Sequence, residues 1–323
     1  MQKIILVILL LFHSSNLFAF DLKRAKSEFP KNDFQNKIIF LDEIISGGPP
    51  RDGIPPIDYP KFKKMDISMG PNEPVIYLEI NNDAKIYPIR VLTWHEIVND
   101  QVGGIPVSVT YCPLCNASIV FDRRFEDKVL DFGTSGRLRK SDLIMYDRQT
   151  ETWWQQFTGQ GIVGELAGNK LKKIPALIIP FKEALKIKKN KGYEIKILKG
   201  DAARRYGDNP YVGYDKSGFP FLYSGGLPKD ISPMDYVIVV EEIAYSLSLI
   251  QREKIIKKNG IIITWSEGLN SALEENKIKK GRDLGFVRVQ KEIDGKLQDI
   301  LYDYTFAFVF HAFHDGKKVI QNR

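Results

Sequence analysis

The chain has 323 residues, enough for one large hydrophobic core or two smaller ones, and its formal net charge is +7. The basic residues are spread along the chain and are not interleaved with stacking aromatics, so composition argues against a nucleic-acid-binding protein. The two cysteines, Cys112 and Cys115, can close only a short loop, so a disulfide that staples the whole fold is excluded as well.

Residues 1–19 have the pattern of a secretory signal peptide. Lys3 gives a positive start, residues 4–12 form an unbroken apolar run, and Ala19 places a small residue at the expected cleavage point. The apolar run is shorter than the roughly 20 residues that a transmembrane helix needs, and no later run is long enough. We therefore expect an exported protein, periplasmic or secreted, with no transmembrane segment after cleavage.

Residues 20–37 are polar and mixed, which predicts a loose leader. The Gly- and Pro-rich stretch that follows, residues 47–56, excludes a helix and predicts an ordered loop over a surface. Thr93 and Glu96 fit a capping box, so we expect a short helix that begins at Thr93 and ends before Gly103. A second short helix is expected near residues 181–188.

Most of the remaining chain predicts strands. Apolar and β-branched residues, in several places alternating with polar ones, are typical of half-buried strands. The expected strands before residue 170 are 75–80, 84–91, 107–111, 118–122, 128–132, 142–147 and 161–166.

From residue 237 the chain echoes its own earlier pattern. Residues 242–250 resemble residues 84–92, and residues 261–265 then correspond to residues 107–111, without cysteine or histidine at the matching places. We therefore predict a β-rich α+β protein with mostly antiparallel strands, a few short helices and two related halves. The expected halves are residues 38–235, which carry the cysteines, and residues 236–323, packed together as one compact unit.

Cys112-Pro113-Leu114-Cys115 is the sharpest chemical feature of the sequence. A thioredoxin-like centre places its first cysteine at a helix N-terminus, whereas residues 118–122 favour a strand after this pair. Two sulfurs at the tip of a strand hairpin face one point, which suits zinc or copper, or a strained disulfide. A metal site, a redox or regulatory disulfide, and a pair with only a structural role all stay open.

Three histidines follow the expected signal peptide: His95, His311 and His314. His95 falls in the first turn of the predicted helix, where the helix dipole favours the neutral, coordinating ring. His311 and His314 follow a strand expected at 304–310, in which they would point to opposite faces, so at most one of them joins a site. The candidate residues for metal or redox chemistry are therefore Cys112, Cys115, His95 and His314.

A second group of polar and aromatic residues lies between residues 142 and 154. An Asp next to an Arg, with tryptophan nearby, could bind a polar ligand such as a sugar or a carboxylate. The same residues fit a buried ion pair in a turn with core tryptophans. The candidate ligand pocket consists of Asp142, Asp147, Arg148, Trp154 and Tyr111.

The same motifs resemble one bacterial family, catalogued as domain of unknown function 3179. The resemblance covers roughly residues 40–315 and implies a mostly exported protein, but it supplies no reaction. Asn116 departs from the commoner pattern, in which Gly is frequent after the second cysteine. The resembling motifs are residues 94–100, 109–115, 121–123, 141–150, 164–168, 206–211 and 312–314.

Together these features favour a periplasmic protein that binds a metal, zinc or copper, or a small ligand at a Cys-x-x-Cys/His site. A thiol–disulfide oxidoreductase or a metal-dependent enzyme is the first alternative. A scaffold that binds another envelope protein, with a purely structural disulfide, is the second.

Overall fold

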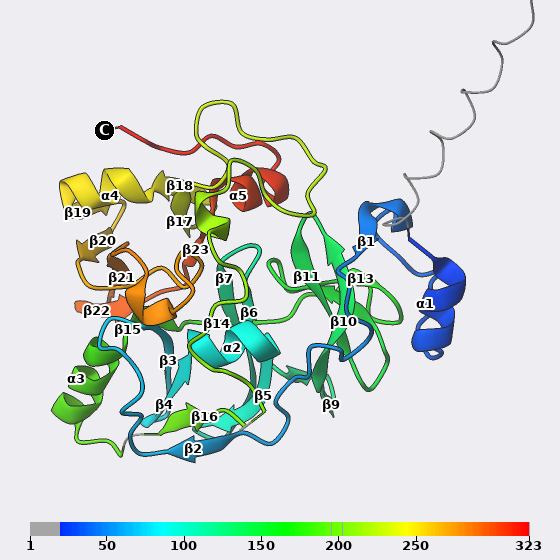
Figure 1. Ribbon diagram of the computed structural model, residues 1–323, viewed down its shortest axis with the longest axis horizontal. Helices are drawn as coiled ribbons and strands as arrows, with labels where there is room; N and C mark the ends of the chain where they lie inside the picture. Colours follow the sequence, from blue (N-terminus) through cyan, green and yellow to red (C-terminus); the bar gives the residue numbers. More distant parts are fainter. Residues whose placement is uncertain (1–19, 195, 202, 323) are drawn as a thin grey trace, which may run out of the picture.

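The computed structural model describes residues 20–194, 196–201 and 203–322 (Figure 1). The expected signal peptide, residues 1–19, lies outside the described residues. The fold is β-rich, with mostly antiparallel sheets and short helices, as the sequence predicts. Among the described residues, no helix has the length and apolar character needed to cross a membrane.

Two sheets and two helices form the first repeat. One sheet has the order β15 (Leu177–Pro180), β3 (Pro74–Ile80), β4 (Asp83–Pro88), β16 (Ile197–Lys199) and β2 (Lys61–Lys63). The other has the order β14 (Lys173–Ile174), β7 (Ala117–Asp122), β6 (Ile105–Cys112) and β5 (Ile97–Val102). Helix α2 (Ile89–His95) connects β4 to β5, and α3 (Phe181–Lys191) follows β15.

The second repeat has the same plan. Its sheets have the orders β18 (Ile243–Ser246), β17 (Tyr236–Val240), β23 (Asp303–Phe306) and β19 (Ile255–Lys258), β20 (Ile261–Ser266), β21 (Phe286–Ile293), β22 (Lys296–Asp299). Helix α4 (Leu247–Glu253) connects the two sheets as α2 does, and α5 (Ala307–Phe313) follows β23 as α3 follows β15. In Figure 1 this repeat, yellow to red, lies above the first.

Backbone geometry shows which residues of the two repeats correspond to each other. Glu96 ends α2 with φ 58° and ψ −31°, and Lys254 ends α4 with φ 61° and ψ −36°. The amide of Tyr111 donates to the Glu96 carbonyl at 2.8 Å, and that of Trp265 donates to the Lys254 carbonyl at 2.9 Å. Glu96 therefore matches Lys254, and Tyr111 matches Trp265.

A further antiparallel sheet packs beside the repeats. Its order is β1 (Ile44–Ser46), β10 (Phe132–Arg139), β11 (Asp142–Asp147), β12 (Trp153–Gln155) and β13 (Gln160–Val163). The small hairpin β8 (Arg124–Phe125) and β9 (Lys128–Val129) precedes β10. The 3-10 turns of the described residues are η1 (Leu41–Glu43), η2 (Tyr214–Lys216) and η3 (Ile278–Lys280).

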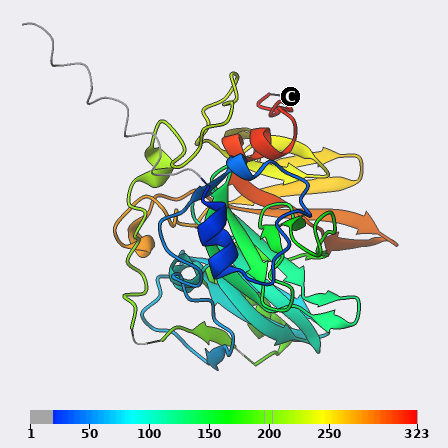
Figure 2. The ribbon, with the colours of Figure 1, turned by 90° about the vertical axis from the view of Figure 1, so that its right-hand side faces the viewer.

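The segment expected to be a loose leader is instead packed. Residues 22–28 form helix α1, which covers the outer side of this sheet in Figures 1 and 2. Phe29 and Phe34 are buried, and each presents an edge-to-face contact to Trp153 with ring centroids 5.2 Å apart. The segment packs against the sheet although its composition is polar, because each aromatic residue buries a large apolar area.

Two local predictions are wrong. Helix α2 begins after Pro88, and Thr93 lies in its last turn, where Oγ1 donates to the Ile89 carbonyl at 2.7 Å, so no capping box forms and residues 97–102 are strand β5. The strand expected at 304–310 ends at Phe306, and His311 lies in helix α5.

Candidate functional site

Cys112 and Cys115 sit at the tip of the β6–β7 hairpin, the strand–C-x-x-C–strand arrangement that the sequence predicts. The amide of Cys115 donates to the Cys112 carbonyl at 3.3 Å, and Asn116 completes the turn with φ 47°. Asn tolerates this left-handed conformation, so the departure from Gly at this position is accommodated. The tip is held by Thr305, whose Oγ1 donates to the Cys115 carbonyl at 2.7 Å.

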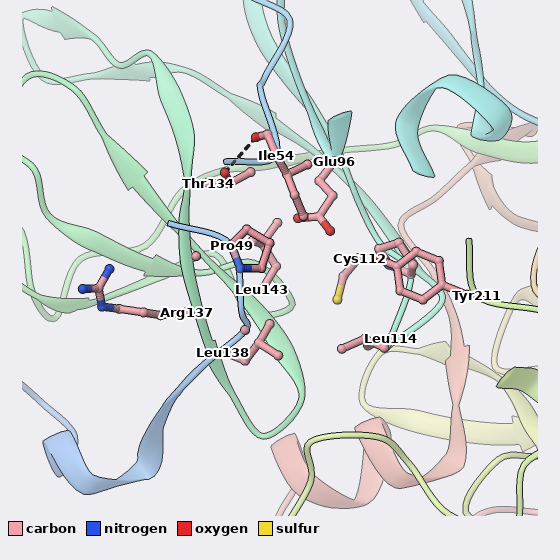
Figure 3. A pocket seen from close by; sticks show the side chains of 13 residues that line it. Pro49, Ile54, Glu96, Cys112, Leu114, Thr134, Arg137, Leu138, Leu143 and Tyr211 are labelled. Atoms are coloured by element: carbon pink, nitrogen blue, oxygen red, sulfur yellow. Dashed lines mark hydrogen bonds between the residues drawn. The ribbon is translucent and has the colours of Figure 1, made fainter. Parts of the chain in front are cut away.

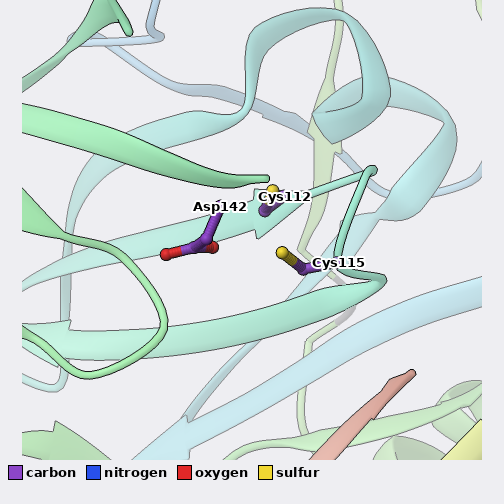
Figure 4. Close-up of side chains that lie close together, drawn as sticks. All are labelled: Cys112, Cys115 and Asp142. Atoms are coloured by element: carbon purple, nitrogen blue, oxygen red, sulfur yellow. The ribbon is translucent and has the colours of Figure 1, made fainter. Parts of the chain in front are cut away.

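Asp142, the first residue of β11, faces the two cysteines (Figure 4). An oxygen of its carboxyl and the two Sγ atoms all lie within 4.8 Å of one another, and all three residues are buried. Positive φ values of 54° at Lys140 and 66° at Ser141 form the tight turn that brings β11 to this point. This three-residue group is what the structure assembles from the predicted site residues.

The Asp142 carboxyl is only half satisfied. One oxygen, Oδ2, accepts hydrogen bonds from Gln155 Nε2 at 2.7 Å and from the Phe157 amide at 2.8 Å. The other, Oδ1, is buried without a hydrogen-bond partner. Both thiols donate to the Ser141 carbonyl, at 3.9 Å from Cys112 and 3.6 Å from Cys115. Buried polar atoms are almost always paired, so this carboxyl has hydrogen-bonding capacity left for the two thiols or for a bound cation.

Glu96 adds a fourth acidic group. Its side chain is buried, with 7 % of the residue exposed, and burial together with the Asp142 charge raises its pKa to about 8. Within the described residues its carboxyl has no hydrogen-bond partner and no ion pair. The sequence predicts Glu96 only as part of a capping box, because no sequence pattern marks a buried glutamate at a strained helix end.

Burial also raises the pKa values of the other three groups. The pKa of Asp142 rises to about 6, although its hydrogen bonds from Gln155 and Phe157 oppose the shift. The pKa of the Cys112 thiol rises, and that of Cys115 rises well above its usual range. No basic side chain in the described chain forms an ion pair with Asp142. Without a cation, burial therefore favours the protonated forms of Glu96 and both thiols near neutral pH, and it shifts the pKa of Asp142 in the same direction.

A pocket of about 110 Å³ opens beside Cys112. Figure 3 shows the Cys112 sulfur and the Glu96 carboxyl pointing into it. Its walls are mostly apolar, from Pro49, Ile54, Leu114, Leu138, Leu143 and Tyr211. Arg137 also lines the pocket, but its guanidinium turns away and pairs with Glu28 at 2.6 Å.

Neither histidine of the predicted set joins the two cysteines. The Nδ1 atom of His95 lies 2.7 Å from the Pro55 carbonyl, and Nε2 lies 2.6 Å from Tyr206 Oη, so both ring nitrogens are engaged. His314 Nδ1 lies 3.2 Å from the Phe310 carbonyl, and its ring stacks on Phe310. The carboxyl of Asp142 takes the place expected for an imidazole.

The residues predicted to shape a ligand pocket are separated. Asp147 accepts hydrogen bonds from the Thr150 amide at 2.6 Å and from Trp154 Nε1 at 2.8 Å. Asp147 and Trp154 are therefore a buried structural pair. Arg148 pairs with Asp58 at 2.8 Å. Tyr111 Oη donates to Asn116 Oδ1 at 3.1 Å in the hairpin tip. Of this set, only Asp142 faces the cysteines.

None of the curated proteins and none of the solved structures compared with the chain matches it. One family does match, over residues 51–317, a range that contains both cysteines, Glu96 and Asp142. Because the match covers most of the chain, the protein belongs to the family described as "Protein of unknown function (DUF3179)".

Proposed function

We propose that the protein binds a thiophilic metal ion, zinc(II) or copper(I), through Cys112 Sγ, Cys115 Sγ and a carboxyl oxygen of Asp142. The observation that carries the proposal is the fully buried Asp142 carboxyl, one oxygen of which lies within 4.8 Å of both sulfurs. Thiolate and carboxylate are both zinc ligands, and thiolate also suits copper(I). Asp142 replaces the histidines in the expected ligand set.

Charge supports a cation at this point. Deprotonation of both thiols and of Asp142 would leave three negative charges in a buried region without a paired basic side chain. A dication offsets most of that charge, and its binding releases the protons that burial otherwise retains. Three protein ligands leave a tetrahedral ion with one open position, which is typical of catalytic rather than structural zinc sites.

The test is the metal content of the mature protein, purified without chelator or affinity tag. We expect about one equivalent of zinc or copper in the native protein and little in Cys112→Ser and Asp142→Asn. His314→Ala is the matched control, since it alters a half-buried side chain outside the group, and it should keep the metal. Equal metal content in all four proteins, or none in the native one, would refute the site.

A thiol–disulfide oxidoreductase is the second candidate. Cys112 lines the pocket whereas Cys115 is fully buried, so an attacking and a resolving thiol are distinguished by access. In this reaction the Cys112–Cys115 bond would form as the partner's S–S bond breaks, and the two thiol protons would pass to the two partner sulfurs, one of them by way of Asp142. A metal-free protein with a disulfide that glutathione readily reduces would favour this candidate over the metal site.

A further inference from the structure

The carboxyl of Glu96 has no role in the fold. Lys254 occupies the matching position with nearly the same φ and ψ, so the strained helix end belongs to the repeat and does not depend on a glutamate. Lys254 is exposed and lies over the Trp265 ring at 3.5 Å, whereas Glu96 is buried without a partner in the described chain. The Glu96 carboxyl points into the pocket without a partner from the described chain, so it is available to bind a ligand there.

The space in front of Glu96 limits what that ligand can be. Its volume of about 110 Å³ is well below the roughly 300–1,000 Å³ of sites for drug-sized molecules. Glu96 and Cys112 both point into the pocket (Figure 3), whose other walls are mostly apolar, since the Thr134 hydroxyl is bound to the Ile54 carbonyl and the Arg137 guanidinium turns away. The pocket therefore fits a molecule of a few non-hydrogen atoms with an apolar body.

Charge selects further among small molecules. With a dication bound to two thiolates and a carboxylate, the site already carries excess negative charge, and Glu96, whose pKa burial raises to about 8, adds to it once it ionises. The guanidinium of Arg137 does not offset it, because that group is bound to Glu28 and to the Ser135 carbonyl at 2.8 Å. Anions are thus disfavoured, and a neutral ligand with a donor group is favoured.

We propose that this pocket binds a small uncharged molecule that gives a lone pair to the open metal position and donates an N–H or O–H hydrogen bond to Glu96. The proposal rests on the proposed metal site. It assigns Glu96 as a ligand-binding residue and the apolar walls as the determinant of ligand size.

Cobalt(II) in the full mature protein provides the test, because its visible absorption changes when a ligand takes the open position. Imidazole is the neutral probe, with one nitrogen for the metal and an N–H for Glu96, and azide is the anionic probe. We expect imidazole to bind more tightly than azide. When titrated above the Glu96 pKa of about 8, Glu96→Gln should bind imidazole about tenfold more weakly, since a hydrogen bond to a charged acceptor is lost, and azide more tightly.

Glu126→Gln is the matched control. Glu126 has a comparable φ of 52°, but its side chain is exposed, so its substitution should leave both affinities unchanged. Leu138→Phe is an independent variant that fills the pocket, and it should retain cobalt while losing imidazole.

The outcomes separate the two proposals. Native protein that does not retain cobalt overturns the metal site and, with it, the ligand pocket. Retained cobalt with equal imidazole affinity in the native, Glu96→Gln and Leu138→Phe proteins overturns the ligand pocket alone. Retained cobalt with weaker imidazole binding in both variants, and none of this change in Glu126→Gln, supports both proposals.

Discussion

Asp142 and Glu96 are buried carboxyls close enough to influence each other, yet their surroundings differ. Asp142 accepts two hydrogen bonds on one oxygen, which limits the rise of its pKa to about 6. Glu96 accepts none in the described chain, and burial raises its pKa to about 8. Near neutral pH the metal-free protein therefore ionises Asp142 before Glu96, so the charge nearest the sulfurs forms first.

This difference predicts a pH-dependent stability of the metal-free protein. Between its usual pKa of 4.5 and about 8, folded Glu96 holds a proton that the unfolded chain has lost, so stability falls as pH rises through this window. Urea unfolding of chelated protein should show a loss between pH 6 and pH 8 that is about 1–3 kcal/mol larger than in Glu96→Gln. If the stability of the two proteins depended on pH in the same way, Glu96 would not be the group with the raised pKa.

The residues of the site differ in how far the sequence could predict their position. The cysteine hairpin could be predicted, because strand alternation and C-x-x-C spacing are local patterns. Asp142 was predicted only as a pocket residue, since its approach to the cysteines depends on a contact between β11 and the β6–β7 tip. Glu96 was missed, because the local pattern from Thr93 favoured a helix start over the strained helix end that forms.

One wall of the pocket depends on an irregularity in strand β10. The β10–β11 register shifts between Thr134 and Arg137, which places Gly136 in a bulge with φ 73°. The Gly- and Pro-rich loop docks there: the Gly47 amide donates to the Gly136 carbonyl at 2.8 Å, and Thr134 Oγ1 donates to the Ile54 carbonyl at 2.8 Å. The sequence predicted an ordered loop but not this docking surface.

A side chain at residue 136 should displace that loop. A Cβ atom on Gly136 would lie 2.1 Å from the Pro49 carbonyl oxygen, so Gly136→Ala requires backbone movement in the pocket wall. We expect a stability loss of about 2–4 kcal/mol and weaker imidazole binding, with the metal retained. Thermal unfolding and the cobalt titration measure the two effects.

Gly260→Ala is the control for this prediction, because Gly260 has a φ of 75° and nothing within 4 Å of its added Cβ. It should show only the left-handed backbone cost, about 1 kcal/mol, and unchanged imidazole binding. If the two alanine variants behave alike, steric contact with the loop is not what shapes the pocket.

At the scale of the whole molecule, the repeat was visible in the sequence only as a short echo. Strand order, connecting helices and helix-end geometry now align residues 74–112 with residues 236–266. The side chains diverged because packing needs only apolar character and suitable volume, while the backbone plan persisted. The additional sheet between the cysteines and α1 has no counterpart in the second repeat, so no internal comparison predicts it.

The two repeats share one core, and this predicts a single unfolding transition. One buried cluster includes Val109 and Met145 together with Ile238 and Val289, and Thr305 of the second repeat holds the cysteine tip. Far-UV circular dichroism and reaction of the cysteines with a thiol reagent should report the same midpoint in urea. Thiol exposure at clearly lower urea than loss of strand signal would show that the halves unfold separately.

Helix α1 affects the pocket, because Glu28 at its end pairs with the Arg137 guanidinium and holds that group away from the pocket. In a protein shortened to begin after residue 37, that guanidinium would lose its carboxylate partner while keeping its hydrogen bond to the Ser135 carbonyl. The positive charge of Arg137 would then be unpaired at the pocket wall. Anions, which the intact protein disfavours, would bind more favourably there. Ligand screens on such a shortened form would therefore select compounds for a charge balance that the longer chain does not have.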